Sequence, residues 1–318
     1  MRKIVSLANN APEPSYESSV FSQIPDCEYI TATASSDEEV IELTRDAEVI
    51  LFTATSLNKN VISHLEKCKL MVRYGIGYDT VDLDAAREKG IFVCNSPKYG
   101  VTDVAEHAIS LMFAAAKHLV EMNDNIKDGI WGPAGTQNIR LAGKNIGFLG
   151  FGNIGRAVCE RTNAFGMKAL VYDPFVTDEI LNEYNASKAS LDDILKNSDV
   201  ITCHLPLNES TYHMLGAKEF DKMKNSAILV NTSRGGVINE KELIDALEEG
   251  KLFGVGLDVF EDENGGMDKR MLNIKNAVLT PHVAWNTGEA IISLHMEVAD
   301  NVAKYMRGER PDSIVNGL

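Results

Sequence analysis

Short apolar runs alternate with amphipathic stretches along almost the whole chain. In the first third, apolar runs stand at residues 3–7, 48–52, 69–74 and 91–94. Helical stretches lie between them. One opens at Ser36 with Glu39 three residues on, the spacing of a capping box, and another ends at Gly90, a residue suited to a left-handed helix end. Strands separated by helices predict parallel βαβ units.

A second series of apolar runs begins at Lys144. A longer helix is predicted before it, from about residue 102 to 120, followed by an irregular stretch around Trp131. The predicted strands of the second series span residues 145–150, 168–173, 200–204, 227–231, 254–259 and 277–280. A last helix is predicted over 288–307 because five apolar residues recur at helical spacing: Ile291, Leu294, Val298, Val302 and Tyr305. The pattern predicts an α/β protein built on doubly wound parallel sheets.

Length and charge narrow the classes of function. At ~150 residues per domain, 318 residues predict two domains. The net charge of -15 argues against nucleic-acid binding and against an anionic membrane surface, both of which need clustered Lys and Arg. A small anionic substrate remains compatible with this net charge. Salt screens the repulsion from distant acidic residues, so one nearby Arg can still attract the substrate. No apolar run approaches the ~20 residues of a membrane span. The five cysteines form no CxxC pair, which predicts reduced thiols in the cytoplasm.

The best-defined motif is Gly150-Phe151-Gly152-Asn153-Ile154-Gly155. It follows a predicted strand and opens a predicted helix, which is the context of a dinucleotide-binding loop. Gly150 suits the tight turn, Gly152 lets a pyrophosphate approach the backbone, and Gly155 allows close helix–strand packing. The free N–H groups of the helix N-terminus would attract the phosphates.

Asp173 ends the next predicted strand, 18 residues after Gly155. A carboxylate at this place binds the ribose hydroxyls and repels the 2′-phosphate of NADP, so NAD is the predicted cofactor. The alternative is an ordinary turn Asp before Pro174.

Two reactive side chains follow predicted strands of the second series. Arg234 follows residues 227–231, and His282 follows residues 277–280. Ligands of open parallel sheets bind beyond the carboxyl ends of the strands, so these side chains are expected to converge. A guanidinium offers a planar fork to a carboxylate, and an imidazole can protonate the alkoxide left by hydride transfer. The alternatives are a surface salt bridge for Arg234 and a structural histidine at 282.

Two acids complete the predicted site. Glu263 could pair with His282, fixing the tautomer and favouring the charged imidazole. Asp258 could accept a hydrogen bond from the nicotinamide amide. His204 could line the nicotinamide loop, no other histidine is assigned to the chemistry, and no metal site is predicted.

Taken together, these motifs resemble the D-isomer-specific 2-hydroxyacid dehydrogenases over nearly the whole chain. The resemblance rests on Val72-Arg73-Tyr74-Gly75-Ile76-Gly77-Tyr78-Asp79, on the glycine motif, on His204-Leu205-Pro206-Leu207, on Asn231-Thr232-Ser233-Arg234-Gly235-Gly236, on Gly256-Leu257-Asp258-Val259-Phe260, and on Thr280-Pro281-His282-Val283-Ala284-Trp285.

The resemblance implies a Rossmann cofactor domain, residues 99–285, inserted into a flavodoxin-like substrate domain, residues 1–98 and 286–318. It also implies a homodimer formed through residues 100–140. Arg234 would bind the substrate carboxylate and polarise the keto group, while His282 would be the acid/base and Glu263 its partner. The substrate, a small 2-keto or 2-hydroxy acid, would contact Tyr74, Gly75, Ile76 and Gly77. The implied NAD contacts are Thr102, Gly150, Gly152, Asn153, Ile154, Gly155, Asp173, Pro206, Thr211, Thr232, Ser233 and Asp258.

The chain departs from the family pattern near the proposed acid. Asn264 follows Glu263 where members often have Pro, and Glu261 and Asp262 are neighbouring acids, so the assignment of Glu263 rests on its spacing from Asp258. The 3-phosphoglycerate dehydrogenases of this family carry Arg in the loop that spans residues 53–57 here. These residues include no cation, which disfavours a phosphorylated substrate such as 3-phosphoglycerate.

The histidine motif with Trp285 is similar to the motif found in glycerate and hydroxypyruvate reductases, and also to that of NAD-binding corepressors of the same fold. An NAD-sensing, corepressor-like interaction protein is therefore the alternative function. A cofactor-binding scaffold with an idle site is a weaker one. The sequence leaves open the particular acid, the direction of flux and any closure of the domains.

Overall fold

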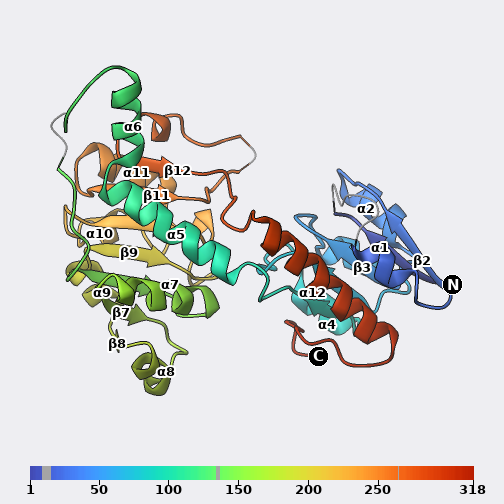
Figure 1. Cartoon of the computed structure of the whole chain (residues 1–318). Coiled ribbons are helices and arrows are strands. Elements are labelled where there is room, and N and C mark those ends of the chain that lie inside the picture. Colours follow the sequence, from blue (N-terminus) through green and yellow to red (C-terminus); the bar gives the residue numbers. More distant parts are fainter. Residues whose placement is uncertain (9–15, 134–136, 264) are drawn as a thin grey trace. The chain divides into compact units, whose positions relative to one another are not determined.

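The computed structural model describes residues 1–8, 16–133, 137–263 and 265–318, and the chain divides into two compact units (Figure 1). The first comprises Met1–Gly100 and Thr287–Leu318, and the second comprises Val101–Asn286. These boundaries lie within two residues of the predicted ones. Residues 134–136 of the predicted dimerisation segment, and Asn264, lie outside the described residues.

The first unit is built on five parallel strands in the order β2-β1-β3-β4-β5. This order is the one found in flavodoxin-like folds. The inner strands β3 and β4 are almost wholly buried, as expected where both faces of a parallel sheet are covered. The strands span Arg2–Ser6 (β1), Cys27–Thr31 (β2), Val49–Phe52 (β3), Leu70–Arg73 (β4) and Phe92–Cys94 (β5).

Local signals set the helix ends of this unit. The Ser36 side chain accepts a hydrogen bond from Glu39 N at the start of α2, and Gly90 takes φ 65° after α4. The C-terminal helix α12 returns to this unit, where Val298 and Val302 are fully buried. The helices span Tyr16–Phe21 (α1), Asp37–Thr44 (α2), Lys59–Ser63 (α3), Leu83–Glu88 (α4) and Gly288–Met306 (α12).

The second unit is built on seven parallel strands in the order β12-β11-β10-β9-β6-β7-β8. Because β6 pairs with both β7 and β9, the strand order reverses at β6, which makes its carboxyl end the switch point where doubly wound folds bind ligands. The predicted fold class is confirmed. The strands span Asn145–Leu149 (β6), Lys168–Tyr172 (β7), Ala186–Lys188 (β8), Val200–Cys203 (β9), Ile228–Asn231 (β10), Gly254–Leu257 (β11) and Ala277–Leu279 (β12).

The predicted helix 102–120 is wrong in extent, because two helices occupy this part of the chain. α5 ends at Ala116, His118 takes the left-handed conformation at φ 48°, and α6 starts at Leu119. The His118 ring packs edge-on against Phe253, with 5.0 Å between the ring centroids. The local sequence gives no signal for this contact, because Phe253 is distant along the chain. The helices span Val101–Ala116 (α5), Leu119–Lys127 (α6), Asn153–Ala164 (α7), Asp178–Glu183 (α8), Leu191–Asn197 (α9), Ala217–Phe220 (α10) and Glu240–Glu248 (α11), with 3₁₀ turns at Gly235–Val237 (η1) and Met271–Asn273 (η2).

The sequence pattern missed two strands, β2 and β8. Both lie at sheet edges and neither contains a fully buried residue. An edge strand needs no continuous apolar run, so hydrophobic pattern alone gives it little signal.

Candidate active site

The glycine motif forms the turn between β6 and α7. Gly150 has φ 90°, and a Cβ there would lie 2.6 Å from the carbonyl oxygen of His204. A Cβ on Gly155 would lie 2.8 Å from the carbonyl oxygen of Gly150, whereas one on Gly152 would meet nothing within 4 Å. The first and third glycines are therefore required by the protein's own backbone, while the open side of Gly152 leaves room for a phosphate group.

Asp173 lies beside this turn. Its Oδ2 accepts a hydrogen bond from Phe151 N at 2.7 Å, and its Oδ1 accepts one from Phe175 N at 2.8 Å. The carboxylate therefore lies at the edge of the glycine turn, where it can bind ribose hydroxyls and oppose a 2′-phosphate. The open turn and this carboxylate together fit NAD.

The other predicted cofactor contacts lie at the carboxyl ends of neighbouring strands or at a helix start. After β9, Thr211 Oγ1 donates to the carbonyl oxygen of Pro206 at 2.6 Å and fixes the turn between them. After β10, the Thr232 hydroxyl is buried and has no partner among the described residues, as suits a ligand contact. Ser233 N donates to Asn231 Oδ1, and Thr102 is exposed in the first turn of α5.

His282 and Glu263 are brought together. His282 Nδ1 lies 2.7 Å from Glu263 Oε2, and His282 takes the left-handed conformation at φ 54°. Partial burial favours the neutral form of Glu263, but its hydrogen bond with His282 and the charges of His282 and Arg234 keep its pKa below the usual value. Of the neighbouring acids, Glu261 pairs instead with His213.

Arg234 lies between β10 and η1. Its Nη1 donates to the carbonyl oxygen of Ser233 at 2.8 Å, and its charge contributes to the lowered pKa of Glu263. A Cβ on Gly235 would lie 2.0 Å from the carbonyl carbon of Phe260, so only glycine lets this turn approach the loop that carries Glu263. The arrangement can bind an anion at Arg234 and move a proton at His282.

Asp258, predicted to meet the nicotinamide amide, is almost wholly buried at 1% exposure. Its carboxylate accepts hydrogen bonds from Val283 N and Ala284 N, each at 2.9 Å, and from the Thr280 hydroxyl at 2.6 Å. The protein itself engages both carboxylate oxygens, and through them Asp258 holds the residues that follow His282.

His204 does not suit the role of proton donor at neutral pH. Burial lowers its pKa to about 4, and its Nε2 lies 2.9 Å from the Thr202 hydroxyl. Its ring is therefore uncharged. Its backbone carbonyl oxygen occupies the position that a side chain at residue 150 would need.

The predicted substrate loop lies in the first unit, directly after β4. Tyr74 is buried and donates its hydroxyl to Glu17 at 2.8 Å, so its ring serves the core of this unit. Gly75 has φ 143°, and its N–H donates to the carbonyl oxygen of Arg73, so this predicted substrate contact is engaged within the protein.

Arg73 was missed as a cation near the predicted substrate loop. A Cβ on Gly75 would lie 2.0 Å from Arg73 Nη1, so the guanidinium lies against this glycine. The sequence signal was present, since Arg73 ends a strand two residues before the glycine. The prediction that a phosphorylated substrate is disfavoured rests on residues 53–57, and Arg73 lies outside that segment.

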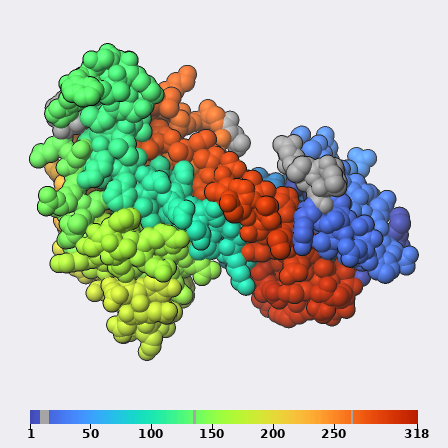
Figure 2. All heavy atoms as spheres, in the orientation of Figure 1, coloured from blue at the N-terminus to red at the C-terminus, as the bar shows by residue number. Residues whose placement is uncertain are grey.

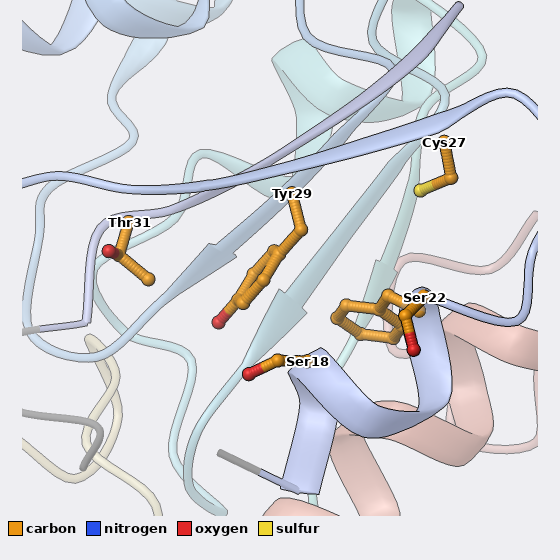
Figure 3. Close-up of a pocket in the computed structure, with 6 residues that line it drawn as sticks. Ser18, Ser22, Cys27, Tyr29 and Thr31 are labelled. Atoms are coloured by element: carbon orange, nitrogen blue, oxygen red, sulfur yellow. The ribbon is translucent and has the colours of Figure 1, made fainter. Parts of the chain in front are cut away.

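A cavity of about 420 Å³ lies elsewhere in the first unit, between α1 and β2 (Figure 3). Its lining residues include none of the predicted site: Ser18, Phe21, Ser22, Cys27, Tyr29 and Thr31. Within the described residues, no cluster of His, Cys, Asp and Glu could hold a metal ion, and no helix has the length and apolar character to span a membrane.

Comparison with known proteins agrees with this geometry. Residues 109–284 match the family model described as "D-isomer specific 2-hydroxyacid dehydrogenase, NAD binding domain". The chain belongs to this family. It is 38% identical to D-3-phosphoglycerate dehydrogenase of Methanocaldococcus jannaschii, over 90% of this chain and 55% of that protein. It is 37% identical to hydroxypyruvate reductase of Thermotoga maritima, over 86% of this chain and 90% of the reductase.

A solved structure of a related enzyme has the same fold as this chain. D-lactate dehydrogenase from Aquifex aeolicus, complexed with NAD and lactic acid, superposes with a TM-score of 0.87 at 28% identity, covering 97% of this chain and 96% of that one. The chain spans about half the length of the phosphoglycerate dehydrogenases that it matches. The family places NAD at the second unit, whose glycine turn and Asp173 fit it.

Proposed function

We propose that this protein is an NAD-dependent dehydrogenase that interconverts a small D-2-hydroxy acid and its 2-keto acid. The observation that carries the proposal is the 2.7 Å contact between His282 and Glu263, with Arg234 close enough to lower the pKa of that acid. All three lie beyond the carboxyl ends of strands in the NAD-binding unit. The relatives are named as dehydrogenases and reductases, which does not favour the alternative of a corepressor-like protein.

The proposed chemistry follows from the donors and acceptors of these side chains. When bound, NADH supplies the hydride that adds to the keto carbon. Arg234 binds the substrate carboxylate with its planar fork and polarises the keto group. Because Nδ1 of His282 is engaged by Glu263, Nε2 is the atom that gives its proton to the carbonyl oxygen. In the oxidation direction the same atom accepts the hydroxyl proton.

The cofactor would be held by the groups already described. The N–H groups that follow Gly152 would bind the pyrophosphate, Asp173 the adenosine ribose, and Thr232 and Ser233 the nicotinamide half.

The test is NADH oxidation by the purified protein at pH ~6.5, near the ordinary His pKa, against a panel of keto acids. The panel includes glyoxylate, hydroxypyruvate, pyruvate, 2-ketoisocaproate, phenylpyruvate and, because of Arg73, 3-phosphohydroxypyruvate. His282→Ala should lower kcat by about 10²–10⁴, the usual contribution of a general acid, and leave NADH affinity unchanged. His64→Ala, at an exposed histidine of the first unit, is the matched control.

Two results would oppose the proposal. If no acid in the panel is turned over although NADH binds tightly, the protein is a cofactor-sensing partner or acts outside this substrate class. If His282→Ala keeps full turnover with chemistry rate-limiting, His282 is not the acid.

We also propose that the protein is a homodimer formed through residues 100–140. Within this segment, α6 and residues 128–131, green in Figure 2, lie at the surface of the second unit and expose several large apolar side chains, an arrangement typical of an interface. They are Leu119, Val120, Ile126, Ile130 and Trp131, which is 91% exposed. The cytoplasmic location stays a prediction, with which five unpaired cysteines agree.

A further inference from the structure

A chain of three side chains runs from helix α5 to the residues around His282. His107 Nε2 on α5 lies 2.9 Å from Thr280 Oγ1, and Thr280 Oγ1 donates to Asp258 Oδ1 at 2.6 Å. His107 Nε2 is also 3.5 Å from Asp258 Oδ1. All three residues belong to the second unit.

The direction of each hydrogen bond follows from chemistry. An ionised carboxylate only accepts, and the Thr280 hydroxyl has one hydrogen, which it gives to Asp258. The hydroxyl oxygen must therefore accept from His107, which fixes a hydrogen on Nε2 of that ring. Burial disfavours ionisation of Asp258, but the hydrogen bonds from His107, Thr280, Val283 N and Ala284 N outweigh it and lower its pKa.

The ionised Asp258 in turn binds the His282 segment through both its backbone carbonyl and its side-chain carboxylate. Its own carbonyl oxygen accepts from His282 N at 2.7 Å, and its carboxylate oxygens accept from Val283 N and Ala284 N. His282 takes φ 54°, which costs a non-glycine residue free energy and persists only where neighbouring contacts impose it. These three backbone contacts help to impose it, together with the bonds from His282 N to the Thr280 carbonyl oxygen and from Trp285 Nε1 to the His282 carbonyl oxygen.

Close packing of α5 on β11 makes this chain of contacts possible. A Cβ on Gly256 would lie 2.7 Å from Leu111 Cβ and 3.3 Å from the Leu111 carbonyl. His107 is four residues before Leu111, so both lie on one face of the helix. Asp258 directly follows β11, two residues after Gly256. The missing side chain at Gly256 thus lets α5 approach until His107 reaches Thr280 and Asp258.

We propose that His107 is a positioning residue for the reaction: through Thr280 and Asp258 it holds the backbone of the segment that carries His282. This inference rests on the proposed function, in which His282 is the acid. His107 itself touches neither substrate nor reacting atoms. It acts on the placement of His282, and a misplacement of about 1 Å costs up to ~10²-fold in rate.

The first test does not require activity. Hydrogen exchange is followed by mass spectrometry on the full protein, in peptides that contain Val283 and Ala284. His107→Leu should accelerate exchange in these peptides about tenfold or more, while His107→Gln, which keeps a donor near the same place, should leave it near the wild-type rate. Ser110→Ala, on the same helix at a more exposed position, is the control.

The second test is kinetic. His107→Leu should lower kcat for keto-acid reduction roughly ten- to hundredfold with the Kd for NADH unchanged, and His107→Gln should recover most of that loss. Thr280→Val should have a similar effect, and Thr280→Ser should not. If the residues act as one chain, the double variant His107→Leu/Thr280→Val should be no slower than the slower single variant.

The outcomes separate the two proposals. Unchanged hydrogen exchange in His107→Leu, additive losses in the double variant, or a loss that His107→Gln does not recover would each overturn the positioning role. Faster exchange with unchanged kcat would overturn it as well. If the wild-type protein reduces no keto acid, or if His282→Ala is fully active, the proposed function fails. The hydrogen-exchange result then still decides whether His107 holds this segment.

Discussion

Glu263 Oε2 lies 2.7 Å from His282 Nδ1, although the two residues are 19 positions apart and neither belongs to a helix or strand. Glu263 comes from the loop after β11, and His282 from the turn after β12. These strands are parallel neighbours in one sheet, so their carboxyl ends lie at the same edge. The contact leaves Nε2 as the ring atom open to proton transfer.

This pair predicts opposite pH dependences for the two directions of the reaction. Keto-acid reduction should slow as pH rises, because neutral His282 has no proton to give, and hydroxy-acid oxidation should speed up. The pKa of Glu263 is lowered, so its favourable interaction with charged His282 is present above the ordinary Glu pKa and is lost only as pH falls through the lowered value. The negative partner is thus present across the neutral range.

The measurement is kcat for both directions from pH 5 to 9, with rate-limiting chemistry established by a deuterated cofactor. Glu263→Gln should lower kcat for reduction, because a neutral amide orients and stabilises the charged imidazole less than the carboxylate does. Glu261→Gln, which removes the acid paired with His213, is the matched control. A reduction rate that does not vary with pH would contradict the role of His282.

Arg234→Ala should raise KM for the keto acid and lower kcat together. A hydrogen bond to a charged group contributes about 1.5–3 kcal/mol, so kcat/KM should fall at least about tenfold. Arg234→Lys keeps the charge but loses the planar fork, and should recover only part of the loss. Steady-state kinetics measure the effect, and kinetics identical to the wild type in Arg234→Ala would remove this residue from the site.

Asp173→Asn should weaken the preference for NADH over NADPH. The carboxylate beside the glycine turn opposes the 2′-phosphate, and removing its charge should raise relative use of NADPH on the order of tenfold. The ratio of kcat/KM for the two cofactors measures it, with exposed Asp178→Asn as the control. If the ratio does not move, Asp173 does not set cofactor choice.

Trp131→Glu combined with Ile126→Glu should convert the proposed dimer to a monomer, because each change buries a charge in an apolar interface. Light scattering coupled to size exclusion gives the mass in solution. Phe175→Glu is a matched control, since Phe175 is also 91% exposed but lies after β7. A wild-type protein that is monomeric at micromolar concentration would contradict the dimer.

Much of the fold followed from the sequence because its signals are local. The buried strands appeared as apolar runs, and Ser36 and Gly90 marked helix ends through hydrogen bonds and dihedral angles within a few residues. The break at His118 and the edge strands β2 and β8 did not, because the first depends on packing against Phe253 and the others lack a buried apolar run.

By itself the sequence determined two parallel α/β series, a dinucleotide-binding turn at Gly150, and the residue types placed beyond the strand ends. Those properties depend on periodicity and short motifs. Only the tertiary structure decided which acid meets His282, that the Tyr74 hydroxyl is engaged by Glu17, and that Asp258 binds backbone N–H groups. These choices depend on how strand ends and loops distant in sequence approach one another, and that distance is set by packing contacts such as those at Gly235 and Gly256.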